Sequence, residues 1–397
     1  MIDRIFALLA LALAFTGLLL AWSQNPLVWY GFSAVTLTLL AAWCVCRLLL
    51  PSGLFSGGLP GAGSWQILCI ALIPAWGLLQ LNAGWTVYRL ATEVEVLRWA
   101  VFVALFFLAA RLPGDRFSLE LFRVSFGIYA FALTTVSLLD YMTGMKLFGL
   151  GSGRSAGPFL NVDHFATFIL LGFPVALYEA VRGEIGRRLV FAVAAATMIA
   201  AILGTMSRAG VAIFVLEVII MALLLKMTED TSRNELFESP PWRVPALIAG
   251  LGLVFSIVVG WTAFTARLQH ITADGLVRYQ LSEASLSMFL ANPWKGYGLG
   301  TWADVYPAHA LFDRGIFANA AHDDWLQWAC DGGVPVLGAL LLLFSGSVRT
   351  ARRHPWTLGL PIVMLHCVVD FPLQGKFLAG LFWAVYGVAS KSKTASE

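Results

Sequence analysis

The sequence has little charge. Only 12% of its 397 residues are acidic or basic, about half the share of an ordinary soluble domain. The formal net charge of +3 is too small for a nucleic-acid-binding surface, so no nucleic-acid partner is expected. The five cysteines form no C-x-x-C pair, which excludes the usual signatures of a zinc site. Hydrophobic residues make up 59% of the chain, which excludes a disordered protein and a soluble globular enzyme.

The sequence also lacks the usual motifs for metal and nucleotide binding. It contains no D-x-D motif, because Asp323 and Asp324 are adjacent rather than spaced. The G-Y-G-L-G-T stretch at 296–301 lacks the spacing and the lysine of a P-loop. We interpret this stretch as a compact turn that lets the backbone approach its neighbours closely. We therefore expect neither a metal ion nor a cofactor.

Long apolar runs dominate the rest of the chain. A membrane-spanning helix needs about 20 mostly apolar residues, and hydropathy gives about twelve such segments. The sequence therefore predicts an all-α polytopic membrane protein, with residues 1–397 forming one integral membrane domain. We expect the first segment to remain as a span, since it has no clear signal-peptide cleavage site. The predicted spans are 5–22, 28–46, 65–81, 96–110, 121–139, 165–181, 189–205, 209–227, 244–264, 325–344, 356–369 and 377–389.

The basic residues predict the orientation of these spans. With the N-terminus inside, fifteen Lys and Arg residues fall in cytoplasmic segments and five in the short outer loops. Cytoplasmic loops carry the excess of basic residues in membrane proteins. Both termini are therefore expected on the cytoplasmic side.

The longest polar segment, residues 265–322, is then an outer loop. Within it, Val277, Leu281, Ala284 and Met288 recur at helical spacing, which predicts an amphipathic helix over 276–290 that lies on the membrane or on the helix bundle. Asn292 and Pro293 should end this helix. Beyond this loop, the Gly-Gly-Val-Pro stretch at 332–335 predicts a break in the span 325–344.

Two outer arginines are candidate anion-binding residues. Arg208 opens a span on the outer side, where the helix dipole already favours an anion. Arg278 lies near the start of the amphipathic helix. Two guanidinium groups that converge would suit one diphosphate. The alternative is that both arginines only meet lipid headgroups or solvent.

His322 is a candidate general base just before a span. Asp323 and Asp324 follow it, and neighbouring carboxylates raise a histidine pKa and can orient its ring. Such a histidine can take a proton from a sugar hydroxyl. A histidine without a chemical role is the alternative.

Two further sites have competing interpretations. His164 follows Asn161 and Asp163, which either cap the next helix or belong with His164 to a substrate contact. Glu217 lies nine residues into a predicted span, where a carboxylate must be protonated, paired or hydrated. It is either hydrogen-bonded within the bundle or a proton-coupling group.

Three stretches together resemble the O-antigen ligase and O-antigen polymerase (WaaL/Wzy-type) superfamily. The first is G-P-F-L-N-V-D-H-F-A at 157–166, and the second is the S-R-A-G turn at 207–210. The third runs from Arg278 through N-P and G-Y-G-L-G-T-W to A-H-D-D-W-L-Q at 321–327. Each motif is weak alone, but their order and shared outer placement are specific.

The resemblance implies a GT-C-like membrane glycosyltransferase in the bacterial inner membrane, with an active site that faces the periplasm. The donor would be a glycan on undecaprenyl diphosphate, and part of the site would lie in the loop 265–322. Arg208 and Arg278 would bind the diphosphate, and His322 would activate the acceptor hydroxyl for an inverting, metal-independent transfer. Further substrate-binding candidates are Asn161, His164, Asp323, Asp324 and Gln327. Asp163 and Asp323 depart from the family pattern, which often has asparagine there.

The resemblance leaves the acceptor open. A ligase would use lipid A–core, a polymerase would use a second lipid-linked glycan, and a related group glycosylates protein. The modest length and the single long outer loop fit the ligase, ranked first, and the polymerase, ranked second. A chain with no large C-terminal soluble addition weighs against the protein O-oligosaccharyltransferase. A proton-coupled transporter or lipid flippase, with Glu217 as its coupling group, is an alternative of another class.

Overall fold

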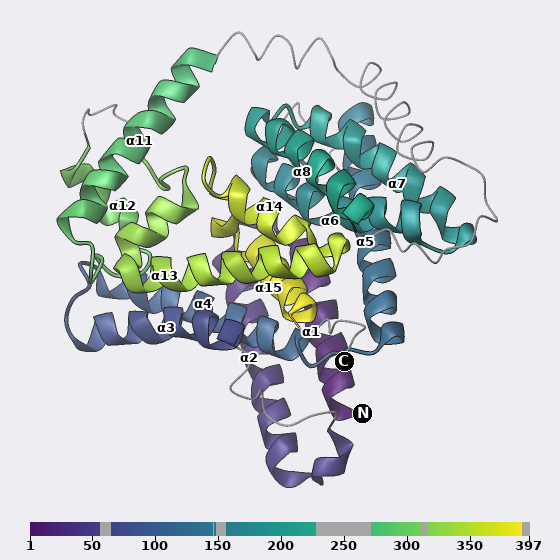
Figure 1. Cartoon of the computed structure of the whole chain (residues 1–397). Helices are drawn as coiled ribbons and strands as arrows, with labels where there is room; N and C mark the ends of the chain where they lie inside the picture. Colours follow the sequence, from purple (N-terminus) through teal and green to yellow (C-terminus); the bar gives the residue numbers. More distant parts are fainter. Residues whose placement is uncertain (56–64, 146, 148–155, 228–270, 311–316, 391–397) are drawn as a thin grey trace.

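The described part of the chain is helical. The computed structural model describes residues 1–55, 65–145, 147, 156–227, 271–310 and 317–390, and within these ranges it has helices and turns but no strands (Figure 1). The predicted all-α class is confirmed over these residues. The longer helices are α1 (Ile2–Leu18), α2 (Pro26–Leu49), α3 (Trp65–Asn82), α4 (Arg89–Ala109), α5 (Arg116–Thr143), α6 (Val162–Arg182), α7 (Ile185–Gly204), α8 (Arg208–Met227), α11 (Ile271–Ala291), α13 (Asp324–Arg353) and α15 (Lys376–Ala389). Two shorter α-helices are α12 (Trp302–Val305) and α14 (Gly359–His366).

The helices pack in two groups. In the first group, α6 contacts α5, α7 and α8. In the second group, α3, α4, α13 and α15 pack together, and α1 and α2 contact α4. The short helix α14 joins the groups, because it contacts α6 and α8 on one side and α13 on the other. Figure 1 shows α13 running between α3 and α14, with α11 and α12 beside its first half. The site described below lies where the two groups meet.

Seven of the described helices are long and apolar enough to cross a membrane: α2, α3, α5, α6, α7, α8 and α13. The chain is therefore a polytopic membrane protein. Of the twelve predicted spans, 244–264 lies outside the described residues, and each of the others falls on a described helix. Several of these helices are short, since α1 has 17 residues, α14 has 8 and α15 has 14.

α4 begins earlier than hydropathy predicts, at Arg89 rather than near residue 96. The added turns carry Glu95, which forms an ion pair with Arg98 one turn further along the helix, and both residues are buried. Arg98 also donates to the side-chain and backbone oxygens of Gln374, at 2.8 and 3.2 Å. Because these charges are satisfied inside the protein, the helix continues through a segment that hydropathy reads as polar.

The predicted break in α13 is confirmed. Gly333 has φ 68° and ψ −167° inside the helix, a left-handed conformation that glycine adopts without a steric penalty. The next residue, Val334, donates its N–H to the Pro293 carbonyl at 2.7 Å. At the kink, a backbone N–H of α13 therefore bonds to the loop that follows α11.

The glycine-rich segment 296–301 forms a compact turn, as the sequence predicts, and this turn packs against the kink. A side chain at Gly296, where φ is 65°, would place its Cβ 2.3 Å from the Asp331 carbonyl oxygen. The buried Gln80 side chain of α3 fastens the turn. Its amide donates to the carbonyls of Lys295 (2.7 Å) and Asp331 (2.9 Å), and its oxygen accepts from the Leu299 N–H (3.0 Å). One side chain thus joins α3, the turn and α13.

Candidate active site

α11 brings Arg278 to the site. Its predicted apolar face is confirmed, because Leu281, Ala284 and Met288 are buried and Val277 is partly buried. This face packs on a small core that includes Trp302, Val305, Ala321 and Cys330. Asn292, which follows α11, ends it as predicted. The helix is therefore held on the first half of α13 by the burial of apolar area.

Arg278 reaches from α11 to the turn that follows α14. Its guanidinium donates to the Val369 carbonyl. Its second terminal nitrogen lies 3.6 Å from Asp163 Oδ2 and 4.0 Å from Asp370 Oδ1. About a third of the side chain, 35%, stays exposed. Arg278 thus neutralises two carboxylates and still offers part of its fork to a ligand.

His322 lies beside the same carboxylate. Its Nδ1 is 3.6 Å from Asp370 Oδ1, and its ring meets the Phe371 ring edge-on, with 4.5 Å between centroids. The His322 backbone has φ 54°, a left-handed conformation that is uncommon for residues other than glycine. Such strain costs of the order of 1–3 kcal/mol and clusters at active sites. The His322 ring thus contacts both Asp370 and Phe371.

Asp370 is the central carboxylate of the site, and the sequence analysis missed it. It is fully buried, in the turn between α14 and α15. Burial alone would raise the pKa of Asp370, but the adjoining His322 and the charges of His366, Arg278 and His164 hold that pKa below its usual value. Asp370 therefore stays ionised at neutral pH. The signal that could have found it is a lone acid directly after an apolar run.

The two acids that follow His322 have other partners. Asp323 caps α13 by accepting the Leu326 N–H at 3.0 Å, and burial raises the pKa of Asp323 to about 6. Asp324 is fully buried and accepts from the Leu373 N–H (3.0 Å) and the Gln374 amide (2.7 Å). The expectation that one of them orients His322 is therefore corrected, because the carboxylate at His322 Nδ1 is that of Asp370. The first turn of α13 instead holds the α14–α15 turn in place.

Gln327 holds the backbone just before His322. Its side-chain oxygen accepts the Ala321 N–H at 3.0 Å. It thereby fixes the residue on the N-terminal side of the strained histidine. The side chain is buried, so its observed contact is with the protein itself.

The start of α6 provides the opposite wall. Asn161 caps this helix by accepting the Asp163 N–H at 2.9 Å, as the capping interpretation predicts. Asp163 itself turns to Arg278, Asp370 and the Ser207 hydroxyl. The His164 ring meets Phe371 edge-on at 5.5 Å. Phe371 therefore contacts both histidines, and Asp163 belongs to the charged cluster.

Arg208 enters at the edge of this cluster. It is the first residue of α8, and it follows Ser207, whose hydroxyl bonds to Asp163 and accepts the Gly210 N–H at 3.0 Å. Met206 has φ 56°, and it and His322 are the two residues other than glycine with positive φ in the described ranges. Of these two, His322 is itself a predicted catalytic residue, and Met206 lies two residues before another, Arg208.

His366 is a second residue that the sequence analysis missed. It is fully buried near the end of α14, and its Nδ1 is 2.8 Å from the Thr167 hydroxyl of α6. The pair joins α14 to α6. Among the described residues, no three His, Cys, Asp or Glu side chains form a group that could hold a metal ion.

Comparison with known families agrees with the motifs. Residues 193–343 match the family model described as O-antigen ligase. The predicted resemblance is confirmed. This ligase segment contains Arg208, Arg278 and His322, whereas Asp163 and Asp370 lie outside it on either side. The search of curated proteins returned no match.

Replacing Asp370 with asparagine tests the contact with His322. We expect transfer to fall about 10–100-fold, the usual effect of losing a group that orients a histidine ring. Because the pKa of Asp370 is depressed, its contribution is present above that pKa and lost only as the pH falls through it. The loss in the variant should therefore be complete at about pH 7–8, far above the usual aspartate value.

Asp323→Asn is the matched control for this variant. Asparagine is also a good N-cap, so α13 should keep its cap and the rate should change only a few-fold. Asp323→Asn should also favour folding above about pH 6, since the raised pKa of Asp323 makes its ionisation unfavourable in the folded state. Equal losses in both variants would mean that Asp370 does not act through His322.

Proposed function

We propose that this protein is a glycosyltransferase of the O-antigen ligase type, which moves a glycan from undecaprenyl diphosphate to an acceptor hydroxyl. One observation carries the proposal. His322 and Arg278 of the ligase segment converge on Asp370, at 3.6 and 4.0 Å, and Asp163 links them to the Ser207–Arg208 turn. The site thus combines a candidate base with cationic groups suited to a diphosphate.

In the proposed reaction, His322 Nε2 takes the proton of the acceptor hydroxyl. The acceptor oxygen bonds to the anomeric carbon as the bond from that carbon to the diphosphate breaks, which inverts the configuration. The bonding electron pair leaves with undecaprenyl diphosphate. Asp370 holds the Nδ1–H of His322 and stabilises the imidazolium that forms. The gap of 3.6 Å would shorten in the substrate complex, since catalytic hydrogen bonds often tighten on binding.

Arg208 and Arg278 would stabilise the diphosphate as its charge grows. Fixed cationic donors help most where charge develops in the transition state. The exposed part of Arg278 supports this role, because its fork is not fully used by Asp163, Asp370 and Val369. Asn161, whose side chain caps α6, and His164, against Phe371, would contribute to the wall on the substrate side.

We propose that the site faces the periplasm and that both termini are cytoplasmic. The basic residues of the sequence support this orientation. α13 provides an internal check, because His322 precedes its first residue and Arg352 and Arg353 lie in its last turn. In this orientation Arg352 and Arg353 lie at the cytoplasmic end of α13, and the active site lies at its periplasmic end.

The acceptor is proposed to be lipid A–core, as for a ligase, with the polymerase reaction second and a protein acceptor third. The test uses purified protein, a metal chelator and a glycan on undecaprenyl diphosphate. One tube contains lipid A–core, and the other contains additional lipid-linked glycan. Product on lipid A–core supports the ligase, and a ladder of longer lipid-linked chains supports the polymerase. No product in either tube would contradict both.

Glu217 distinguishes the transferase from a proton-coupled transporter. It is fully buried in α8, and neither carboxyl oxygen has a hydrogen-bond partner in the described part of the chain. It also lies within a helix, away from the charged cluster at the start of α8. We expect Glu217→Gln to change the transfer rate less than threefold, because glutamine keeps the shape and loses only the ionisable proton.

The measurement is transfer by Glu217→Gln beside Asp370→Asn in the same assay. A carrier mechanism requires the opposite order, with the greater loss in Glu217→Gln. Proton uptake by proteoliposomes on addition of the lipid-linked glycan provides a second measurement. Uptake that disappears in Glu217→Gln would contradict the transferase proposal.

A further inference from the structure

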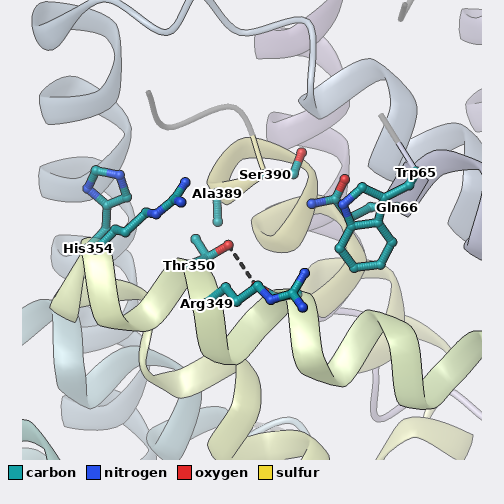
Figure 2. A pocket seen from close by; sticks show the side chains of 9 residues that line it. Trp65, Gln66, Arg349, Thr350, His354, Ala389 and Ser390 are labelled. Atoms are coloured by element: carbon teal, nitrogen blue, oxygen red, sulfur yellow. Dashed lines mark hydrogen bonds between the residues drawn. The ribbon is translucent and has the colours of Figure 1, made fainter. Parts of the chain in front are cut away.

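A second basic cavity lies at the other end of α13. It has a volume of about 240 Å³ and is lined by the last turns of α13, the start of α3 and the end of α15 (Figure 2). His322 precedes the first residue of this 30-residue helix, whereas the cavity lies at its last turns. None of the cavity-lining residues that the structure describes belongs to the charged cluster around Asp370, so the cavity is a different site.

The lining of the cavity suits an anion. Arg349 and Arg353, four residues apart on α13, both line it, together with His354, Thr350 and Gln66. Of the described residues, none that lines the cavity is acidic. Two like charges at this spacing on a helix repel each other, and an anion between them would remove that cost. Figure 2 shows the Arg349 side chain extending from α13 towards Gln66 and Trp65.

The wall opposite the arginines is rigid and aromatic. The Trp65 ring packs over Gly346, where an added Cβ would lie 2.6 Å from the ring and 2.8 Å from the Tyr386 hydroxyl. That hydroxyl donates to the Leu343 carbonyl at 2.5 Å. The Thr350 and Ser390 hydroxyls donate to backbone carbonyls of their own helices, at 2.9 and 2.8 Å. The cavity is thus a built pocket and not a gap between loose side chains.

The dipole of α13 does not by itself account for this pocket. Basic residues are favourable at any helix C-terminus, and Arg352 meets that need without lining the cavity. The position of the cavity at the ends of two spans indicates which kind of ligand it binds. Trp65 is the first residue of one span and Arg353 the last residue of another. Tryptophan and arginine at the ends of spans lie at the level of lipid headgroups.

We propose that this pocket binds a phosphate group through Arg349 and Arg353, and that an anionic phospholipid supplies it. By the orientation proposed above, the lipid belongs to the cytoplasmic leaflet, but the binding chemistry does not depend on the transferase reaction. The two arginines would hold the phosphate oxygens, and Gln66 would add an amide donor. The bound headgroup would join α3, α13 and α15 at the end away from the active site.

The test compares lipid retention by the purified full-length protein. Equal amounts of phosphatidylglycerol and phosphatidylcholine are added, and native mass spectrometry counts the lipid that stays bound. We expect the wild type to retain phosphatidylglycerol about tenfold over phosphatidylcholine, and Arg349→Gln/Arg353→Gln to lose the preference. Arg352→Gln is the matched control, since it removes one charge from the same turn outside the pocket, and should behave as the wild type.

A second arm distinguishes the source of the phosphate. The melting temperature of delipidated protein is measured with inorganic phosphate, in the wild type and in each variant. Stabilisation that needs Arg349 and Arg353, without lipid preference, would support the phosphate site and contradict the lipid source. Equal effects of Arg352→Gln and the pocket variants would overturn the site. The melting temperatures of the delipidated double variant and of Arg352→Gln, measured without phosphate, should both be near that of the wild type, which shows that the loss of binding is not one of folding.

Discussion

Replacing His322 is expected to lower the rate of glycan transfer by two to four orders of magnitude, which is about what a positioned general base contributes. The structure determines which replacement is most informative. His322 has φ 54°, and asparagine tolerates this left-handed region better than alanine does. His322→Asn therefore removes the base with the least disturbance of the backbone. The rate is measured with purified protein and a labelled lipid-linked glycan.

The control for His322→Asn is another histidine of the ligase segment. His309 lies 22 residues from Ser287 along the chain and approaches its hydroxyl at 3.4 Å, and its ring contacts Tyr297. It is not among the groups around Asp370, so His309→Asn should keep the rate within a few-fold. If folded His322→Asn retained more than a tenth of the wild-type rate, His322 would not be the base.

Replacing Arg278 with glutamine is expected to lower kcat by about 10²–10³-fold, the usual effect of removing one donor that stabilises developing charge. Arg278→Lys should restore only part of this loss, because an ammonium group keeps the charge but not the planar fork. Glutamine also removes the ion pairs that Arg278 forms with Asp163 and Asp370. Because Arg278 is proposed to stabilise charge that develops in the transition state, the effect on kcat should exceed the effect on KM, which steady-state kinetics can separate.

Arg89→Gln is the control for Arg278→Gln. Arg89 forms an exposed ion pair with Glu93 within one helix, at 2.8 Å, and such pairs contribute about 0.3–0.5 kcal/mol. Its loss should leave kcat and KM unchanged. If Arg278→Gln raised KM without lowering kcat, Arg278 would bind the donor equally well before and during the reaction, and its proposed role in the transition state would be wrong.

Local pattern predicted part of the site well. The apolar spacing of Val277, Leu281, Ala284 and Met288 predicted α11 and the face by which it packs, and that face determines where Arg278 points. The Gly-Gly-Val-Pro stretch at 332–335 predicted the break in α13. These features depend on neighbours within one helix, so a sequence read in order is sufficient to find them.

The partners of Asp370 could not be predicted in this way. Hydropathy reads 356–369 and 377–389 as two separate spans, but α14 and α15 are short helices, and the turn between them fits against α6 and α13. The partners of a carboxylate in such a turn come from segments more than 40 residues distant, such as Arg278 and His322. For the same reason Asp324 was assigned to the wrong neighbour, since its partners, Leu373 and Gln374, also lie far along the chain.

The Gln80 side chain has a consequence for how the protein is made. Its amide bonds to carbonyls 215 and 251 residues further along the chain, which at ordinary translation rates emerge roughly 10–50 s after α3. During that interval the Gln80 amide, two residues from the end of α3, lacks both of these protein partners. The early helices are thus inserted in a provisional arrangement. Completion of the second half of the chain, with the 292–301 loop and α13, locks the first half in place.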